Sequence, residues 1–132
     1  TNIEKLKSQE DKIEKLSNGI SILIAKPDNY GSEAVKSYIE GKLKSVGAIH
    51  ELHLSMVILI TDVTEDSKLT FYCGVSNDLI PKGIKAKDIV NKVAEVTGGR
   101  GGGKDNFAQA GGKDTSKINE ALNTGLEIIK LI

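Results

Sequence analysis

The sequence predicts an α/β fold in which a mixed β-sheet is flanked by helices. Apolar or β-branched runs of strand length occur at residues 20–25, 56–62 and 69–75, and segments with helical apolar periodicity lie between or after them. The 132 residues suffice for one domain with a modest core. With 27% charged residues and a net charge of zero, the chain has the composition of a globular domain.

Residues 2–17 are highly charged and predict a helix that Asn18-Gly19 would end. Its apolar stripe would be Ile3, Leu6, Ile13 and Leu16. Because the chain starts at Thr1 rather than at Met, we expect it to be a piece of a longer protein. We expect the helix within residues 1–18 either to pack on the domain or to be the end of a longer helical or coiled-coil segment, a connector helix, and residues 19–132 to form the globular domain.

The first half of the domain reads as strand, helix and β-hairpin. After the strand at 20–25 and a turn at 27–29, Ser32 is expected to cap a helix that Gly47 ends. The stripe of this helix would be Val35, Tyr38, Ile39, Leu43 and Val46. The nearly continuous apolar run 56–62 predicts a central strand covered on both faces, with 69–75 as its hairpin partner. Residues 48–55 stay ambiguous.

The second half begins with a predicted loop at 76–85 and a helix at 86–96. A short strand is expected at 107–110. Asp114 or Thr115 would cap a last helix, in which Gly125 would allow close packing on the sheet. Its apolar face would be Ile118, Ala121, Leu122, Gly125, Ile129 and Ile132.

Residues 98–112 hold seven of the 14 glycines in the chain. Ordering so many glycines is costly, so a folded domain keeps them where the backbone must bend or approach something closely. Bare N–H donors beside Arg100 and Lys104 would suit phosphate or another anion. On composition alone, a flexible linker is favoured over an anion-binding loop. However, the run stands between two predicted elements, which indicates a position inside the domain.

This run is not a known nucleotide-binding loop. Residues 98–104 fit G-x-x-x-x-G-K, but Asp105 stands where a P-loop needs Ser or Thr for Mg²⁺, and a helix precedes the run instead of a strand. No G-x-G-x-x-G occurs in it.

Charge is unevenly distributed. Residues 82–117 contain eight Lys or Arg against four acidic residues, whereas residues 1–81 and 118–132 are net negative. A polyanion would be attracted to this basic segment, although an ordinary solvated surface explains the same pattern.

Little in the sequence points to catalysis. His50 and His53 are three residues apart, but no Cys or His cluster completes a metal site. The single cysteine, Cys73, is interpreted as a small buried side chain, and its presence without a partner fits a reducing, cytoplasmic compartment. The longest apolar run, 56–60, is too short to span a membrane. We therefore assign neither catalytic nor metal-binding residues.

Two motifs resemble the DHHA1 domain found at the C-terminus of alanyl-tRNA synthetases. Residues 75–79 read Val-Ser-Asn-Asp-Leu, and residues 101–112 read Gly-Gly-Gly-Lys-Asp-Asn-Phe-Ala-Gln-Ala-Gly-Gly, with the specific ending Ala-Gln-Ala-Gly-Gly. In this family the glycine run is followed by Arg-Pro-Asp-Met, where this chain has Lys104, Asp105, Asn106 and Phe107. Lysine keeps the charge but loses the bidentate fork, Asp105 adds an anion, and Asn106 removes one.

The resemblance implies a non-catalytic domain that docks the elbow of tRNA(Ala) and so supports aminoacylation and editing. The domain itself would need no cofactor, while the parent alanine–tRNA ligase would use ATP, Mg and Zn. Expected partners are the tRNA, the remaining domains of the parent and, as a possibility left open, a second copy, but no membrane. The predicted contact residues are Arg100, Gly101, Gly102, Gly103, Lys104, Asn106, Gln109, Lys82 and Lys85. Two alternatives are a dimerisation or protein-interaction module and the nucleic-acid-binding domain of a DHH-family phosphodiesterase.

Overall fold

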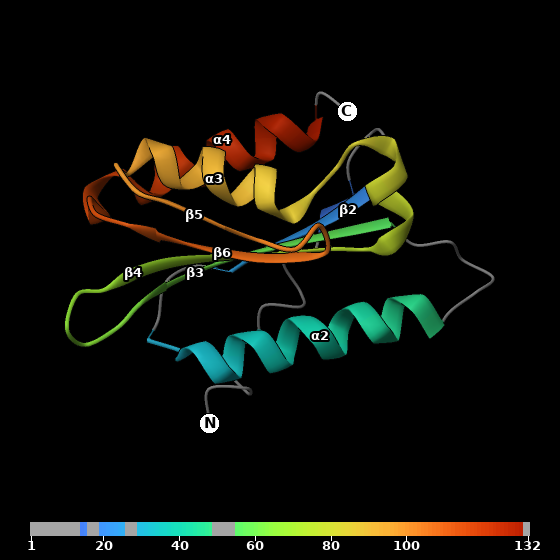
Figure 1. Ribbon diagram of the computed structural model, residues 1–132, viewed down its shortest axis with the longest axis horizontal. Coiled ribbons are helices and arrows are strands. Elements are labelled where there is room, and N and C mark those ends of the chain that lie inside the picture. The colour runs from blue at the N-terminus through green and yellow to red at the C-terminus, as the bar shows by residue number, and fades with distance from the viewer. Residues whose placement is uncertain (1–13, 16–18, 26–28, 49–54, 131–132) are drawn as a thin grey trace.

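The computed structural model describes residues 14–15, 19–25, 29–48 and 55–130. Six strands form one sheet in the order β1-β2-β3-β4-β6-β5. Strands β2 and β3 are parallel, and every other neighbouring pair is antiparallel. Helix α2 covers one face of the sheet, while α3 and α4 cover the other (Figure 1). The predicted mixed sheet flanked by helices is confirmed.

The central strands lie where the apolar runs predicted them. Strands β2 (Ile20–Ala25), β3 (Ser55–Val63) and β4 (Leu69–Val75) follow in sequence, with α2 (Ser32–Ala48) crossing from β2 to β3. Side chains of β3 alternate between the two cores: Val57 and Leu59 face α3 and α4, whereas Ile58 and Ile60 face α2. The strand is therefore buried on both faces, as its continuous apolar run predicted.

Helix α2 packs closely on β4. Val35, Tyr38 and Ile39 are buried, and Leu43 packs beside them, so this part of the predicted stripe is confirmed. A Cβ at Gly74 of β4 would clash with the Ile39 side chain, which explains why glycine stands in an otherwise apolar strand. The helix ends at Ala48, one residue beyond the predicted stop.

The second half adds α3 (Ala86–Val96) and α4 (Ile118–Lys130) on the opposite face. The predicted buried face of α3 is confirmed, and in α4 the predicted Ala121, Leu122, Gly125 and Ile129 are buried, whereas Ile118 is half-buried against the core. A Cβ at Gly125 would lie 2.9 Å from Leu59 Cδ2 and 3.0 Å from Val93 Cγ2, which confirms the close packing expected there. Asp114 is the capping residue: its carboxylate accepts the Ser116 N–H at 3.0 Å, one short helical turn (Thr115–Lys117) before α4.

Two predictions about local structure are wrong. Glu14 and Lys15 form β1, paired antiparallel with Ser21 and Ile22, where a helix over 2–17 was expected. This pairing satisfies main-chain groups at the edge of β2, which outweighs a weak helical preference. The rest of that segment, the turn at 27–28 and Ile132 lie outside the described residues. In the predicted loop at 76–85, residues Asn77–Lys82 form a 3₁₀ helix, η2, closed by Gly83 at φ +90°.

A buried carboxylate stabilises the segment that leads into the N-terminus of α2. Asp62, at the end of β3, accepts hydrogen bonds from the N–H of Tyr30 at 2.6 Å and of Gly31 at 3.0 Å. The Gly31 carbonyl then accepts the first helical bond, from Val35 N–H at 3.2 Å. Gly31 thus occupies the cap position expected for Ser32. Since the negative charge lies near the positive end of the helix dipole, it also stabilises α2.

We expect Asp62→Ala to lower the free energy of unfolding by about 2–3 kcal/mol, because the substitution leaves donors without their acceptor in a mostly buried position. Urea denaturation followed by circular dichroism measures this change. Glu40→Ala, an exposed carboxylate on α2, is the matched control and should change stability by less than about 0.5 kcal/mol. Equal effects of the two substitutions would contradict the role of Asp62.

Candidate nucleic-acid interface

The glycine-rich run forms an edge strand. Residues Arg100–Gly103 are β5, which pairs antiparallel with β6 (Phe107–Gly112) through a turn at 104–106. We call residues 100–112 the glycine hairpin. Because the run is hydrogen-bonded into the sheet, the linker interpretation is wrong. The predicted strand at 107–110 is confirmed and extends two residues further.

Alternate glycines let β5 lie unusually close to β6. A Cβ at Gly99 would clash with the Gly111 carbonyl oxygen, and one at Gly101 would clash with Ala110 Cα. At Gly103 a Cβ would lie 2.8 Å from Ala108 Cα, whereas at Gly102 it would meet nothing within 4 Å. In Figure 1 β5 passes between β6 and α3. The first function of these glycines is therefore close packing of the hairpin beneath α3.

Some of the main-chain N–H groups that were predicted to bind an anion instead donate hydrogen bonds within the domain. Gly101 N–H donates to Asn91 Oδ1 at 2.9 Å, and Lys104 N–H donates to the Phe107 carbonyl at 2.8 Å. The alternation of an antiparallel ladder then directs the N–H groups of Arg100 and Gly102 toward β6 and leaves that of Gly103 on the outer edge. Contacts to an anion would thus depend mainly on side chains.

The hairpin turn is anchored to two other elements. The Asp105 carbonyl accepts the N–H of Ala86, the first residue of α3, at 2.7 Å. The Asn106 carbonyl accepts the N–H of Val75, the last residue of β4, at 3.0 Å. The exposed side chain of Lys104 is therefore presented from a well-held backbone.

The predicted contact residues fall into two groups. Lys104 and Asn106 in the turn lie beside the start of α3, where Lys85 is the N-cap and Lys82 ends η2 three residues earlier. Arg100 stands at the opposite end of β5, four residues or roughly 13 Å from Lys104. Between these ends, Gln109 on β6 is paired with Gly102. All are exposed except Gly102 and Lys85, which are half-buried.

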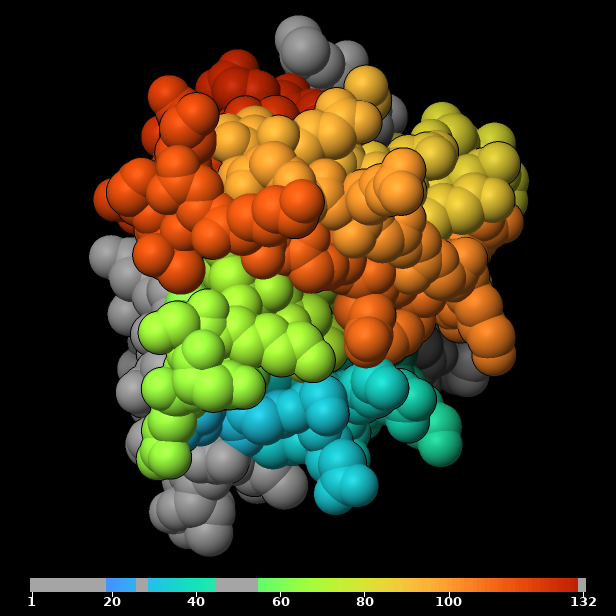
Figure 2. Space-filling model, turned by 60° about the vertical axis from the view of Figure 1, so that its left-hand side comes forward, coloured from blue at the N-terminus to red at the C-terminus, as the bar shows by residue number. Residues whose placement is uncertain are grey.

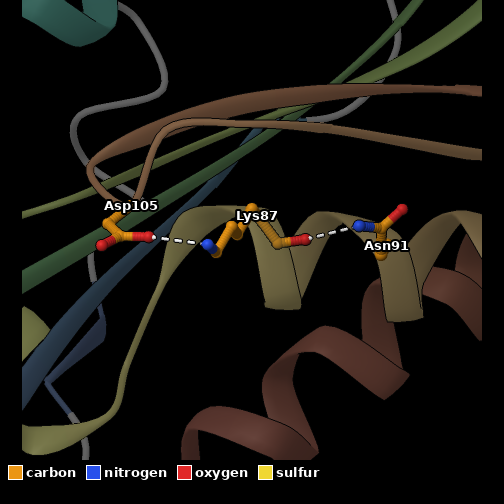
Figure 3. A network of polar contacts seen from close by, with 3 residues as sticks. All are labelled: Lys87, Asn91 and Asp105. Atoms are coloured by element: carbon orange, nitrogen blue, oxygen red, sulfur yellow. Dashed lines mark hydrogen bonds and ion pairs between the residues drawn. The ribbon is translucent and has the colours of Figure 1, made fainter.

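Sequence reasoning missed a polar network behind the turn, drawn in Figure 3. Lys87 Nζ lies 3.3 Å from Asp105 Oδ1, with the two side chains 44% and 41% exposed. Asn91 Nδ2 donates to the Lys87 carbonyl at 3.0 Å, which orients its Oδ1 toward Gly101. A surface ion pair of this kind is worth about 0–1 kcal/mol. The signal in the sequence was Asp105 itself, at the position where the resemblance described above leads one to expect proline.

The motif at residues 75–79 has a structural explanation. Ser76 Oγ accepts the Met56 N–H at 3.0 Å, and Ser55 Oγ donates to Asp78 at the start of η2. Partial burial by itself raises the pKa of Asp78, but hydrogen bonds from Ser55 and Ser76 outweigh it and hold this pKa below its ordinary value. The motif therefore joins the start of β3 to the end of β4 and positions η2.

The other residues considered for catalysis or metal binding were Cys73, His50 and His53. Cys73 is fully buried in β4, and burial raises the pKa of its thiol, so it packs as an apolar side chain. His50 and His53 lie outside the described residues. Among those that are described, no three His, Cys, Asp or Glu side chains come together to hold a metal ion. None of the described helices is long and apolar enough to cross a membrane.

Fold and site together define a small α/β domain with a mixed sheet and an exposed, basic glycine hairpin at one edge. The chain belongs to the DHHA1 domain family, whose model matches residues 19–131.

Curated relatives of the chain are alanine–tRNA ligases. It is 36% identical over 126 residues to that of Dehalococcoides mccartyi, covering 92% of this chain and 14% of the relative. It is 39% identical over 112 residues to that of Fusobacterium nucleatum, covering 85% of this chain and 12% of the relative. The chain thus spans only 12–14% of the length of these relatives.

Two solved structures share the fold. One is the C-Ala domain of Aquifex aeolicus alanyl-tRNA synthetase, with a TM-score of 0.71 at 24% identity, covering 89% of this chain and 97% of that one. The other is a DHH-domain member of the s1p family of ribosomal proteins, with a TM-score of 0.68 at 14% identity, covering 98% of this chain and 30% of that one.

The glycine packing predicts different effects at neighbouring positions. Gly101→Ala should lower the free energy of unfolding by about 2–3 kcal/mol, because its Cβ meets backbone that cannot move aside. Gly102→Ala has open space and should leave stability unchanged or raise it by up to about 1 kcal/mol. Urea denaturation of both variants checks this. A destabilised Gly102→Ala with an unaffected Gly101→Ala would refute the packing argument.

The lowered pKa of Asp78 predicts a loss of stability in acid. Its contribution is complete above the ordinary value of 3.8 and is lost as the pH falls through the lower pKa of the folded state. Asp78→Asn should therefore lose less stability than the wild type between pH 5 and pH 2 (roughly the range of such a titration). Denaturation at several pH values, with NMR titration of the carboxyl, measures it. A carboxyl that titrates above 3.8 would overturn the assignment.

Proposed function

We propose that this chain is the tRNA-binding DHHA1 domain of an alanine–tRNA ligase. Two findings support this function. The relatives are alanine–tRNA ligases, and the fold is that of a C-Ala domain. The observation that carries the proposal is the exposure of basic side chains on and around the glycine hairpin. None of the eight Lys and Arg residues between 82 and 117 is buried.

The hairpin offers a surface suited to the backbone of a folded RNA. Figure 2 shows residues of β5 and β6, in orange, at the surface above the β3–β4 hairpin in green. Arg100 at one end of β5 and Lys104 at the other would contact separate phosphates, with Lys82 and Lys85 extending the charge beyond the turn. Asn106 and Gln109 would bond sugars or base edges. Such contacts position the RNA and recognise its shape more than its sequence.

In the parent ligase, this surface would dock the outer corner of tRNA(Ala), so that the aminoacylation and editing centres act on the same bound molecule. Catalysis, with its ATP, Mg and Zn, belongs in this proposal to parts of the ligase outside this chain, and the compartment is the cytoplasm. The partners would be the tRNA and the other domains of the ligase.

Two alternative functions can be distinguished from tRNA binding. A dimerisation module should sediment as a stable dimer that ignores RNA, whereas the proposed function predicts a species that retards tRNA. The DHH phosphodiesterase alternative is supported only by the fold shared with the s1p-family member. In that class the glycine run is typically followed by histidine, but here Lys104 follows it.

Binding of folded tRNA(Ala) should weaken steeply with salt, because phosphate contacts release counterions. Arg100→Ala and Lys104→Ala should each weaken binding several-fold and reduce the slope of log K against log salt by about 0.7–0.9. Lys36→Ala, an exposed lysine on α2 at the opposite face, should change neither quantity. Filter binding across a salt series, with single-stranded RNA and DNA as competitors, measures both. Wild-type affinity in both hairpin variants would refute the site.

A further inference from the structure

Asp105 places a negative charge inside the basic surface of the glycine hairpin. It stands between Lys104 and Asn106, and its carbonyl is bonded to Ala86, the residue that follows Lys85. Its carboxylate is directed at Lys87 on the first turn of α3, 3.3 Å away (Figure 3). Lys87 therefore belongs to the same surface as Lys85 and Lys104, but its charge is already paired.

The carboxylate is not needed to hold the turn. The hairpin is closed by the Lys104–Phe107 main-chain bond and anchored by the main-chain bonds of Asp105 and Asn106 to α3 and β4. A surface ion pair with both partners more than 40% exposed adds little stability. Replacing the carboxylate by an amide would thus preserve the fold and change mainly the charge that Lys87 presents.

Resting on the proposed function, we propose that Asp105 limits the affinity of this surface for RNA by acting as an internal competitor of phosphate. A phosphate that reaches Lys87 must displace the Asp105 carboxylate or bind against its charge. The intact pair therefore removes one cation from the interface and adds local repulsion beside Lys104. The consequence is a weaker and more easily reversed contact with tRNA than the basic residues alone would give.

The proposal makes a specific prediction for neutralised variants. Asp105→Asn should bind tRNA(Ala) roughly three- to ten-fold more tightly at moderate salt, and its salt slope should increase by about 0.7–0.9, the value of one additional phosphate contact. Lys87→Gln alone should weaken binding by less than this gain, because Lys87 is already paired, although the substitution leaves the Asp105 charge uncompensated. In the double variant Asp105→Asn/Lys87→Gln, most of the gain should disappear. The two substitutions are thus expected to be strongly non-additive.

A matched control separates this mechanism from a general charge effect. Asp88 is an exposed carboxylate on the same turn of α3, with no ion pair among the described residues. Asp88→Asn changes the net charge by the same amount as Asp105→Asn. An equal gain from Asp88→Asn would overturn the proposal, as would a gain that survives in the double variant. An Asp105→Asn variant that binds no better than the wild type would overturn it as well.

A second measurement tests the ion pair independently of tRNA. Inorganic tripolyphosphate is titrated into ¹⁵N-labelled wild type and Asp105→Asn, and the chemical shifts of Lys85, Lys87 and Lys104 are followed. Larger shifts at Lys87 in the variant support the competition. If tRNA binds no variant, the proposed function fails while this titration still decides the role of Asp105. Equal shifts in both proteins would overturn the competition even if tRNA binds.

Discussion

The close approach of β5 to β6 is the constraint on which the candidate site depends. Side-chain-free positions at Gly99, Gly101 and Gly103 let the strand pass beneath α3, where any Cβ would meet the backbone of β6. This packing fixes where Arg100 and Lys104 emerge and keeps them at opposite ends of one short strand. The sequence suggested that these glycines bind the ligand directly. In the structure they act on the candidate site indirectly, because their packing positions the neighbouring charged side chains.

Much of the fold could be predicted, because burial leaves a periodic signal in the sequence. Strands β2 and β4 and helix α3 have the predicted bounds. The burial of β3 on both of its faces was predicted from its continuous apolar run. Strand β5 was missed since glycines carry no side-chain pattern, and its pairing depends on β6 and α3. Strand β1 was missed because two residues paired to a sheet edge contain too little information to outweigh a helical pattern.

The candidate site was predicted less completely than the fold. Charge and glycine content located the basic hairpin, and the exposure of Arg100 and Lys104 agrees with that location. The sequence could not show that Gly101 donates to Asn91, or that Lys87 and Asp105, 18 positions apart, form an ion pair. Both contacts cross from α3 to the hairpin, so they exist only once the two elements have packed.

The bond between Asn91 and Gly101 has a consequence for assembly. Strand β5 is the last strand of the sheet on its side, and an unpaired edge commonly recruits a strand from another molecule. Here Asn91, on the helix packed against this edge, supplies an amide oxygen to the Gly101 N–H, so one of the two outward donors of residues 100–103 is already occupied, while that of Gly103 stays on the outer edge. A strand added at this edge would have to displace Asn91 or forgo one main-chain hydrogen bond, which disfavours extension of the sheet into another molecule.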